Sequence, residues 1–268
     1  MPVTRKPEVQ PHPASTVTLI RDTPRGLEVL MMQRSHSLKF MPGVHVFPGG
    51  GLDSADGSRE MQSLCAGLGD EAASRALGVE RGGLAYWVAA IREAFEEAGV
   101  LLAYDRSGEI VDLDSDAERF NGHRLTLHGR HGDFGAIVRE EGLRLAVDRL
   151  TYFGHWITPA TAPRRYDTRF FLAVAPERQK AKHDNHETIA HTWVRPQEAL
   201  DLCAKETLNM RFPTIKTLER FAACSTAAEL IAEVSSSPVV RALPRITHDG
   251  RSLLPGDPGY EEAGRIER

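Results

Sequence analysis

The chain contains short segments in which apolar residues alternate with polar ones, and longer segments in which they recur every three or four positions. The first pattern is typical of β-strands and the second of amphipathic helices. Strands are predicted at residues 14–20, 27–33, 44–47, 100–104, 150–159, 170–175 and 188–194. Turn residues at 22–26 favour a hairpin between the first two strands. Helices are predicted at 59–66, 70–77, 84–100, within 115–142, from 196 onwards, and at 212–224 and 226–233.

The segment 84–100 has the clearest helical pattern and an unusual distribution of charge. At 100° per residue its apolar side chains share one arc, namely those of Leu84, Trp87, Val88, Ile91, Ala94, Phe95 and Ala98. Glu93, Glu96 and Glu97 share the opposite arc. Gly99 follows them and is expected to end the helix in the left-handed conformation. The sequence therefore predicts an amphipathic helix with three carboxylates gathered on the side away from the core.

These carboxylates oppose helix stability in two ways. Like charges three or four residues apart cost a few tenths of a kcal/mol per pair, and the helix dipole disfavours negative charge near the C-terminus. A divalent metal ion bound among them would reverse both effects. The alternative is a solvated acidic face, partly neutralised by Arg92 one turn from Glu96. The helix alone does not decide between the two interpretations.

A glycine-rich turn upstream favours the metal interpretation. Residues 47–53 read Phe-Pro-Gly-Gly-Gly-Leu-Asp, and residues 92–100 read Arg-Glu-Ala-Phe-Glu-Glu-Ala-Gly-Val. Together they resemble the two ends of a Nudix box, G-x5-E-x7-R-E-U-x-E-E-x-G-U, where U is a bulky aliphatic residue. Ala94 occupies the first U position, and Arg92 follows Gly50 by 42 positions where the pattern has 14, so 28 residues are inserted. Such a split is similar to one branch of the Nudix family that includes animal peroxisomal coenzyme A diphosphatases.

The resemblance implies an α/β fold, an α/β/α sandwich around a mixed β-sheet with helical insertions, and a metal site on the glutamate helix. The expected cofactor is Mg²⁺ or Mn²⁺. Its expected ligands are Glu93, Glu96, Glu97 and the carbonyl oxygen of Gly49. Arg92 is expected to orient Glu93 or the glycine turn through a charged hydrogen bond, and so to contribute to catalysis.

Four more acidic side chains take their expected roles from their positions relative to this motif. In the family, the loop before a Trp-x4-Glu-Ala-Leu segment, here at 193–200, commonly contributes an acidic residue. Glu187 is the matching residue, either as general base or as a further metal ligand. Asp184 is the second candidate. Asp56 stands where the pattern has its isolated glutamate, and Asp53 and Asp56 are expected to support the ligands without touching the metal.

Basic residues flank the glycine turn and a later strand. Arg34 and Lys39 match the spacing R-(S/A)-x3-R-x3-G-x3-FPGG, which is found ahead of the Nudix box in coenzyme A diphosphatases, with lysine replacing the second arginine. Arg164 and Arg165 lie between two predicted strands, close to Arg169. All of these cations could hold phosphate groups of a substrate. The alternatives are a solvated basic loop for the first pair and structural ion pairs for the others.

The same patterns suggest how the chain is organised. We expect a flexible tail at 1–13, a Nudix domain at 14–206 with the insertion at about 54–83, and a C-terminal extension at 207–268. The insertion is expected to form one or two helices, which shape the mouth of the substrate site or a homodimer contact. The extension begins with two helices and continues in a Pro- and Gly-rich segment that packs on the domain or on a partner subunit.

Composition narrows the functional classes. The 268 residues are 41% hydrophobic and 26% charged, as in ordinary globular proteins. A net charge of −4 and a pI near 6.3 argue against a nucleic-acid or anionic-membrane surface. Cys65, Cys203 and Cys224 form no close pair, which argues against disulfides or a zinc site and favours a reducing compartment. No signal peptide or membrane-spanning run is visible, so a cytoplasmic location is expected.

The sequence therefore predicts a metal-dependent hydrolase of a diphosphate linkage, whose partner is a small nucleoside diphosphate derivative. The preferred substrate is coenzyme A or an acyl-coenzyme A, cleaved to phosphopantetheine and adenosine bisphosphate. One alternative is ADP-ribose, a dinucleotide or a nucleotide sugar as substrate. Another is a Nudix-like ligand-binding or regulatory module without turnover. The presence of all three motif glutamates favours the enzyme.

Overall fold

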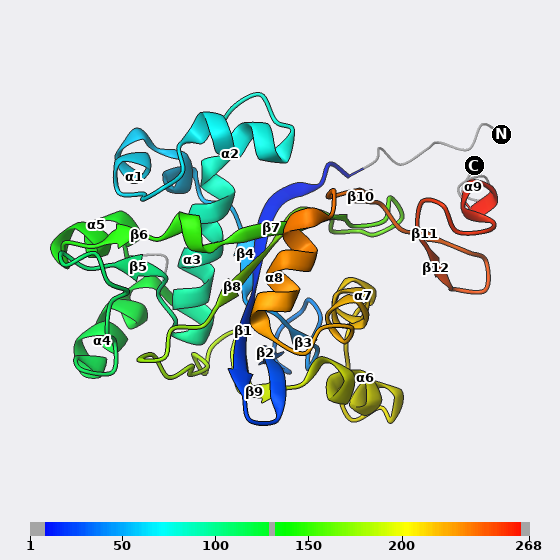
Figure 1. The fold of residues 1–268 in the computed structure, drawn as a ribbon. Coiled ribbons are helices and arrows are strands. Elements are labelled where there is room, and N and C mark those ends of the chain that lie inside the picture. Colours follow the sequence, from blue (N-terminus) through cyan, green and yellow to red (C-terminus); the bar gives the residue numbers. More distant parts are fainter. Residues whose placement is uncertain (1–8, 129–131, 264–268) are drawn as a thin grey trace.

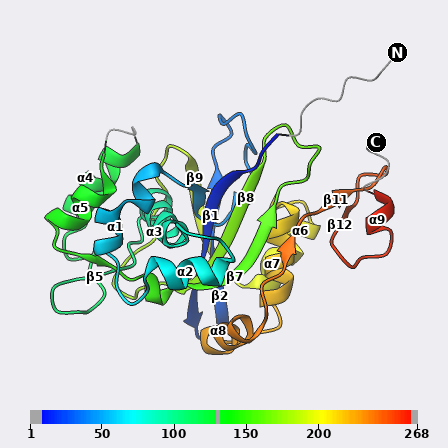
Figure 2. The same ribbon diagram turned by 90° about the horizontal axis from the view of Figure 1, so that it is seen from above.

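A mixed β-sheet forms the centre of the molecule, and helices cover both of its faces (Figure 1, Figure 2). The computed structural model describes residues 9–128 and 132–263. The main sheet consists of β1 (His12–Thr23), β2 (Gly26–Arg34), β3 (His45–Val46), β4 (Gly49–Gly51), β7 (Thr151–Ile157), β8 (Tyr166–Val174), β9 (Thr188–Val194) and β10 (Arg241–Ala242). The strand order is β10-β7-β8-β1-β2-β3, with β4 also paired to β1 and β9 to β2. The β1–β8 and β10–β7 pairs are parallel and the others are antiparallel.

Two small sheets lie outside the main one, β5 (Ala103–Tyr104) with β6 (Arg144–Leu145), and β11 (Arg245–Ile246) with β12 (Ser252–Leu253). The helices are α1 (Arg59–Ser63), α2 (Asp70–Leu77), α3 (Leu84–Ala98), α4 (Ala117–His128), α5 (Phe134–Glu140), α6 (Pro196–Ala204), α7 (Phe212–Phe221), α8 (Ala227–Ser236) and α9 (Tyr260–Ala263). Helices α1 to α5 lie on one side of the sheet and α6 to α8 on the other (Figure 2). The predicted sandwich around a mixed sheet is thus confirmed.

Several boundaries differ from the sequence expectation. The predicted hairpin is present as β1 and β2, joined between Thr23 and Gly26. However, β1 begins inside the predicted tail, because His12 pairs with Tyr166 of β8. For the same reason β8 begins at Tyr166 and not at residue 170. The remaining ends of the predicted tail and extension, residues 1–8 and 264–268, lie outside the described residues.

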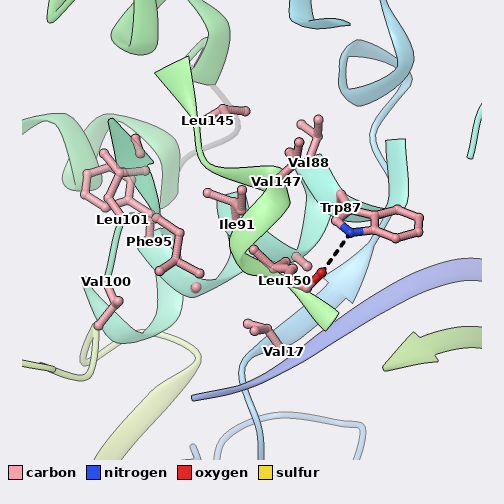
Figure 3. Packing of buried hydrophobic residues seen from close by; sticks show 14 of the residues in the cluster. Val17, Trp87, Val88, Ile91, Phe95, Val100, Leu101, Leu145, Val147 and Leu150 are labelled. Carbon is pink, nitrogen blue, oxygen red and sulfur yellow. Dashed lines mark hydrogen bonds between the residues drawn. The ribbon is translucent and has the colours of Figure 1, made fainter. Parts of the chain in front are cut away.

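Helix α3 packs on the sheet through the apolar arc predicted for it. Trp87, Ile91 and Phe95 are buried, and Figure 3 shows them beside Val17 of β1 and Leu150. The Trp87 indole N–H donates to the Leu150 carbonyl oxygen at 3.4 Å. Burying a large apolar side chain contributes roughly 1.5–3 kcal/mol. This packing fixes the axis of α3 and therefore the direction in which its glutamates point.

The two ends of α3 are also held. At the start, the Asp70 carboxylate accepts hydrogen bonds of 3.0 Å from the N–H groups of Gly82 and Leu84, which satisfies a donor that the helix itself leaves unpaired. At the end, Gly99 adopts the predicted left-handed conformation, with φ of 66°. Within residues 9–128 and 132–263, each helix is too short or too polar to cross a lipid bilayer.

Candidate active site

A cavity of about 1470 Å³ opens beside the carboxylate side of α3. Its wall includes each predicted site residue except Arg165, namely Arg34, Lys39, Gly49, Asp53, Asp56, Arg92, Glu93, Glu96, Glu97, Arg164 and Glu187. The two halves of the interrupted motif therefore meet in space. The first part of the insertion lines the cavity as well, through Ser58, Glu60 and Met61. This favours the expectation that the insertion shapes the substrate site.

Glu97 is the most deeply buried of the three motif glutamates. It is 4% exposed, and the N–H of Gly49 donates to its Oε2 at 3.1 Å. Burial raises the pKa of Glu97 well above its usual value, and the charges of Glu93 and Glu187 raise it further. The side chains of Glu93 and Glu96 are 12% and 21% exposed. The acidic side of α3 is therefore largely shielded from solvent, and Arg92 partly neutralises it, as the alternative interpretation expected.

Glu93 lies directly against the glycine turn. A Cβ atom at Gly50 would lie 2.4 Å from Glu93 Oε1, closer than real Cβ contacts allow. Burial raises the pKa of Glu93 to about 7; the charge of Arg92 opposes this shift, and the charges of Glu96 and Glu187 add to it. A side chain at position 50 would therefore force the Glu93 carboxylate to move from its present position.

Arg92 connects the carboxylates to the insertion. Its guanidinium donates to Glu93 Oε1 at 2.8 Å, to Glu96 Oε1 at 3.3 Å and to the Gly51 carbonyl oxygen at 2.9 Å. It also donates to both carboxylate oxygens of Asp56, at 3.0 Å each. Burial raises the pKa of Asp56, although the hydrogen bonds and charge of Arg92 act to lower it. Arg92 thus makes both of the predicted contacts, with Glu93 and with the glycine turn.

The two aspartates that follow the glycines, Asp53 and Asp56, differ in their surroundings. Asp56 is buried, and its carboxylate also accepts the N–H of Asp53 at 2.8 Å. The Asp53 side chain is 72% exposed, and its carboxylate lies 3.9 Å from Arg92. The buried aspartate fixes the arginine, whereas the exposed one adds only a distant charge.

The loop before β9 contains both of the other acidic candidates. Burial acts to raise the pKa of Asp184, but backbone hydrogen bonds from His186, Thr188 and Glu187 outweigh it and lower that pKa. Asp184 therefore holds the loop in shape. The Glu187 side chain is exposed and lines the cavity, and its charge raises the pKa of both Glu93 and Glu97.

Three of the four predicted phosphate-binding cations line the cavity, Arg34, Lys39 and Arg164. Across the described ranges, none of the three forms an ion pair. The Arg34 Nε atom is buried without a hydrogen-bond partner among these residues, and the charge of Arg34 acts on Glu97. Positive charge is therefore available in the same cavity as the carboxylates.

The prediction for Arg165 is wrong. Its side chain is buried, and it donates to the carbonyl oxygens of Thr158 at 3.0 Å and Val9 at 2.8 Å. It thus ties the β7–β8 connection to the segment before β1. Arg169 is also structural, since it lies on β8 and pairs with Asp167.

Sequence reasoning missed Arg124 of α4. This buried arginine donates to the carbonyl oxygens of Glu96 at 2.7 Å and Glu97 at 2.6 Å. Burial lowers its pKa to about 10. Positive charge at the C-terminal end of a helix satisfies its unpaired carbonyl groups and complements the dipole. No motif surrounds Arg124 in the sequence, so only the three-dimensional contact reveals it.

The residues present fit a hard divalent cation. The donor groups are carboxylate and carbonyl oxygens, which Mg²⁺ and Mn²⁺ prefer. The charge of Glu93 raises the pKa of Glu97, as expected of a site whose charge a cation would balance. In the part of the chain that the structure describes, no three His, Cys, Asp or Glu side chains converge as ligands of one ion do. Two of the expected ligands, Glu93 and Glu96, instead accept hydrogen bonds from the Arg92 guanidinium.

The chain resembles known proteins in sequence and in structure. The model of the NUDT19 Nudix domain matches residues 75–221, which include α3 and the Glu187 loop. The chain is 31% identical to the acyl-coenzyme A diphosphatase NUDT19 of Homo sapiens, over 97% of this chain and 77% of the relative. It is 30% identical to the Gallus gallus protein of the same name, over 89% of this chain and 74% of the relative. The crystal structure of a Nudix hydrolase from Alicyclobacillus acidocaldarius superposes with a TM-score of 0.67 at 27% identity, covering 85% of this chain and 99% of that one.

Proposed function

Because this chain belongs to the Nudix hydrolase family, in the group with the NUDT19 Nudix domain, we propose that it hydrolyses the diphosphate bond of coenzyme A or an acyl-coenzyme A. The products are adenosine bisphosphate and phosphopantetheine, or acyl-phosphopantetheine from an acyl-coenzyme A. The observation that carries this proposal is that one cavity contains Glu97, held by the Gly49 N–H, and Glu93, held by Arg92, together with cations that form no ion pair within the described residues. The two relatives are named acyl-coenzyme A diphosphatases, which supports the choice of substrate.

Glu93, Glu96, Glu97 and the Gly49 carbonyl oxygen are the groups that would hold Mg²⁺ or Mn²⁺. When bound, the metal neutralises phosphate charge and makes a water molecule more acidic. The chain holds its glutamates ready for this role, because the Gly49 N–H fixes Glu97 and Arg92 fixes Glu93. Asp56 in turn fixes Arg92, which supports the proposal that the glutamates are positioned before substrate binds.

Glu187 is proposed as the general base that takes a proton from the attacking water on its carboxylate oxygen. Among the described residues its carboxylate has no ion pair or hydrogen bond, whereas the motif glutamates are each held by a neighbour. Arg34 and Lys39 are proposed to bind phosphate oxygens. Arginine can do so with two parallel hydrogen bonds, and lysine acts as a point charge.

The size and lining of the cavity suit a long substrate. Small-molecule sites usually enclose about 300–1,000 Å³, and this cavity is larger, at about 1470 Å³. Trp156, Phe170 and Phe212 contribute apolar surface to it, with the Trp156 and Phe212 rings 6.1 Å apart. Such surface can take a pantetheine arm or an acyl chain by burial of apolar area.

The test is a comparison of substrates at equal concentration with Mg²⁺ or Mn²⁺. Coenzyme A, an acyl-coenzyme A, ADP-ribose and a dinucleotide are each incubated with the protein, and the products are identified by mass spectrometry. We expect kcat/KM to be highest for coenzyme A or its acyl ester. A higher kcat/KM for ADP-ribose or for the dinucleotide would show that coenzyme A is not the preferred substrate. Absence of hydrolysis across the series would favour the binding-module alternative.

A further inference from the structure

A group of aromatic and basic side chains lines another part of the cavity wall. The rings of Phe40 and Tyr166 lie 5.9 Å apart, centroid to centroid. The guanidinium carbon of Arg164 lies 5.8 Å from each ring centroid. His12 adds a third ring, 6.3 Å from that of Tyr166. These residues come from three separate parts of the chain, so the fold itself assembles the cluster.

The cluster is open to the cavity and is positively charged. Arg164, Phe40, Tyr166 and His12 all line the cavity, as does Lys39, the neighbour of Phe40. Both rings are only partly buried, and the side chains of Arg164 and Lys39 are exposed. Neither cation has a carboxylate partner within residues 9–128 and 132–263.

The chemistry of these groups indicates a specific kind of ligand. Flat aromatic faces bind nucleobases by stacking, and this interaction depends little on which base is present. A guanidinium without a carboxylate partner binds phosphate through paired hydrogen bonds. The proposed metal site accounts for the diphosphate, so a cation beside a base-stacking surface is suited to a further phosphate on the nucleoside.

This inference rests on the proposed function: we infer that the Phe40 ring stacks on the adenine of the substrate, with the Tyr166 ring tilted by 52° beside it, while Arg164, with Lys39 nearby, binds the ribose 3′-phosphate. Arg164 is then the residue that distinguishes coenzyme A from nucleotides without that phosphate. The competing explanation is that Arg164 only holds the two loops together through its contacts with the rings. The two explanations differ in which ligands an Arg164 substitution affects.

The test measures equilibrium binding by calorimetry, with two nucleotides that contain no diphosphate bond. Adenosine 3′,5′-bisphosphate carries the extra phosphate, and AMP lacks it. We expect the wild-type protein to bind the bisphosphate at least tenfold more tightly. Arg164→Gln should weaken binding of the bisphosphate about tenfold and leave AMP unchanged, as expected for loss of one charged phosphate contact. Arg164→Lys should retain part of the preference.

One further variant tests binding of the adenine base separately from binding of the phosphate, and a second serves as its control. Phe40→Leu should weaken the binding of both nucleotides by the same factor, because both contain adenine. Arg81→Gln is the matched control, since Arg81 is exposed and lies outside the cavity wall, and it should change neither affinity.

The inference is overturned if the wild-type protein binds the two nucleotides equally or binds neither, or if Arg164→Gln affects both alike or neither. These measurements need no turnover. A protein that prefers the bisphosphate but does not hydrolyse coenzyme A would therefore refute the proposed function and leave the nucleotide subsite standing.

Discussion

Asp56 and Arg92 lie 36 positions apart in the chain, yet their side chains form two hydrogen bonds of 3.0 Å in a buried setting. Asp56 belongs to the first turn of the insertion and Arg92 to the helix that carries the glutamates. The contact therefore joins the two halves of the interrupted motif. It also places the arginine so that its remaining N–H groups reach Glu93 and Glu96.

Replacing Asp56 should destabilise the fold. In Asp56→Asn, Arg92 loses a charged partner inside the protein, and we expect the free energy of unfolding to fall by about 1–3 kcal/mol. Urea unfolding followed by circular dichroism measures this change. Asp53→Asn is the control, because the more distant and exposed Asp53 carboxylate should contribute less than about 0.5 kcal/mol. If the two variants lowered the free energy of unfolding equally, the buried contact between Asp56 and Arg92 would not be the stabilising feature.

Gly50→Ala should damage the site more than the fold. The new Cβ would meet Glu93 Oε1 at 2.4 Å and displace that carboxylate, and a shift of about 1 Å can cost about a hundredfold in rate. We expect kcat/KM for coenzyme A to drop by roughly that factor. Gly122→Ala is the matched control, because no atom lies within 4 Å of a Cβ there, and helix α4 should gain about 0.5–1 kcal/mol. Full activity in Gly50→Ala would refute the role of Glu93.

Glu97→Gln should separate activity from stability. The amide retains the shape of the side chain but removes a charge that burial and the neighbouring carboxylates disfavour. We expect kcat to fall about a hundredfold or more while the Tm in metal-free buffer stays the same or rises. Kinetics and a thermal melt on one preparation measure both. Glu219→Gln on α7, outside the cavity wall, should leave both values unchanged, and ordinary turnover in Glu97→Gln would remove Glu97 from the proposed site.

A pH effect on stability is expected away from the active site, at Glu28 of β2. Burial acts to raise the pKa of Glu28, but hydrogen bonds and charges from Arg21 and Arg25 outweigh it and lower the pKa below its ordinary value of 4.5. A carboxylate with a lowered pKa contributes stability above its unfolded pKa and loses that contribution as the pH falls through the folded value. The stability difference between wild type and Glu28→Gln should therefore be largest near neutral pH and shrink below about pH 4.5. A difference that stays constant on acidification would contradict this.

The sequence was most informative where local periodicity and a motif coincide. The apolar arc of α3 and the Gly99 cap follow from the helical period and from the conformational freedom of glycine. The fold class followed from the resemblance carried by the same helix. The meeting of Gly49 with Glu97 also followed from the motif, although 48 positions separate the two residues.

Other features depend on contacts that the sequence does not display. Arg164 and Arg165 are adjacent in the bend before β8, yet only Arg164 lines the cavity. Arg165 is buried against the carbonyl oxygens of Thr158 and Val9, and neither partner is marked by any pattern in the sequence. Arg124 went unnoticed because its partners are backbone carbonyl groups of another helix.

The helix that carries the three glutamates is held by two side chains from outside the recognised motif, Asp70 at its first turn and Arg124 at its last. The proposed catalytic helix therefore depends on residues that lie outside the motif. Grafted into a related scaffold that lacks these two partners, the ends of the helix would fray and its carboxylates would lose their present positions. Any effort to shorten this protein or to transfer its activity must carry the two anchoring residues along.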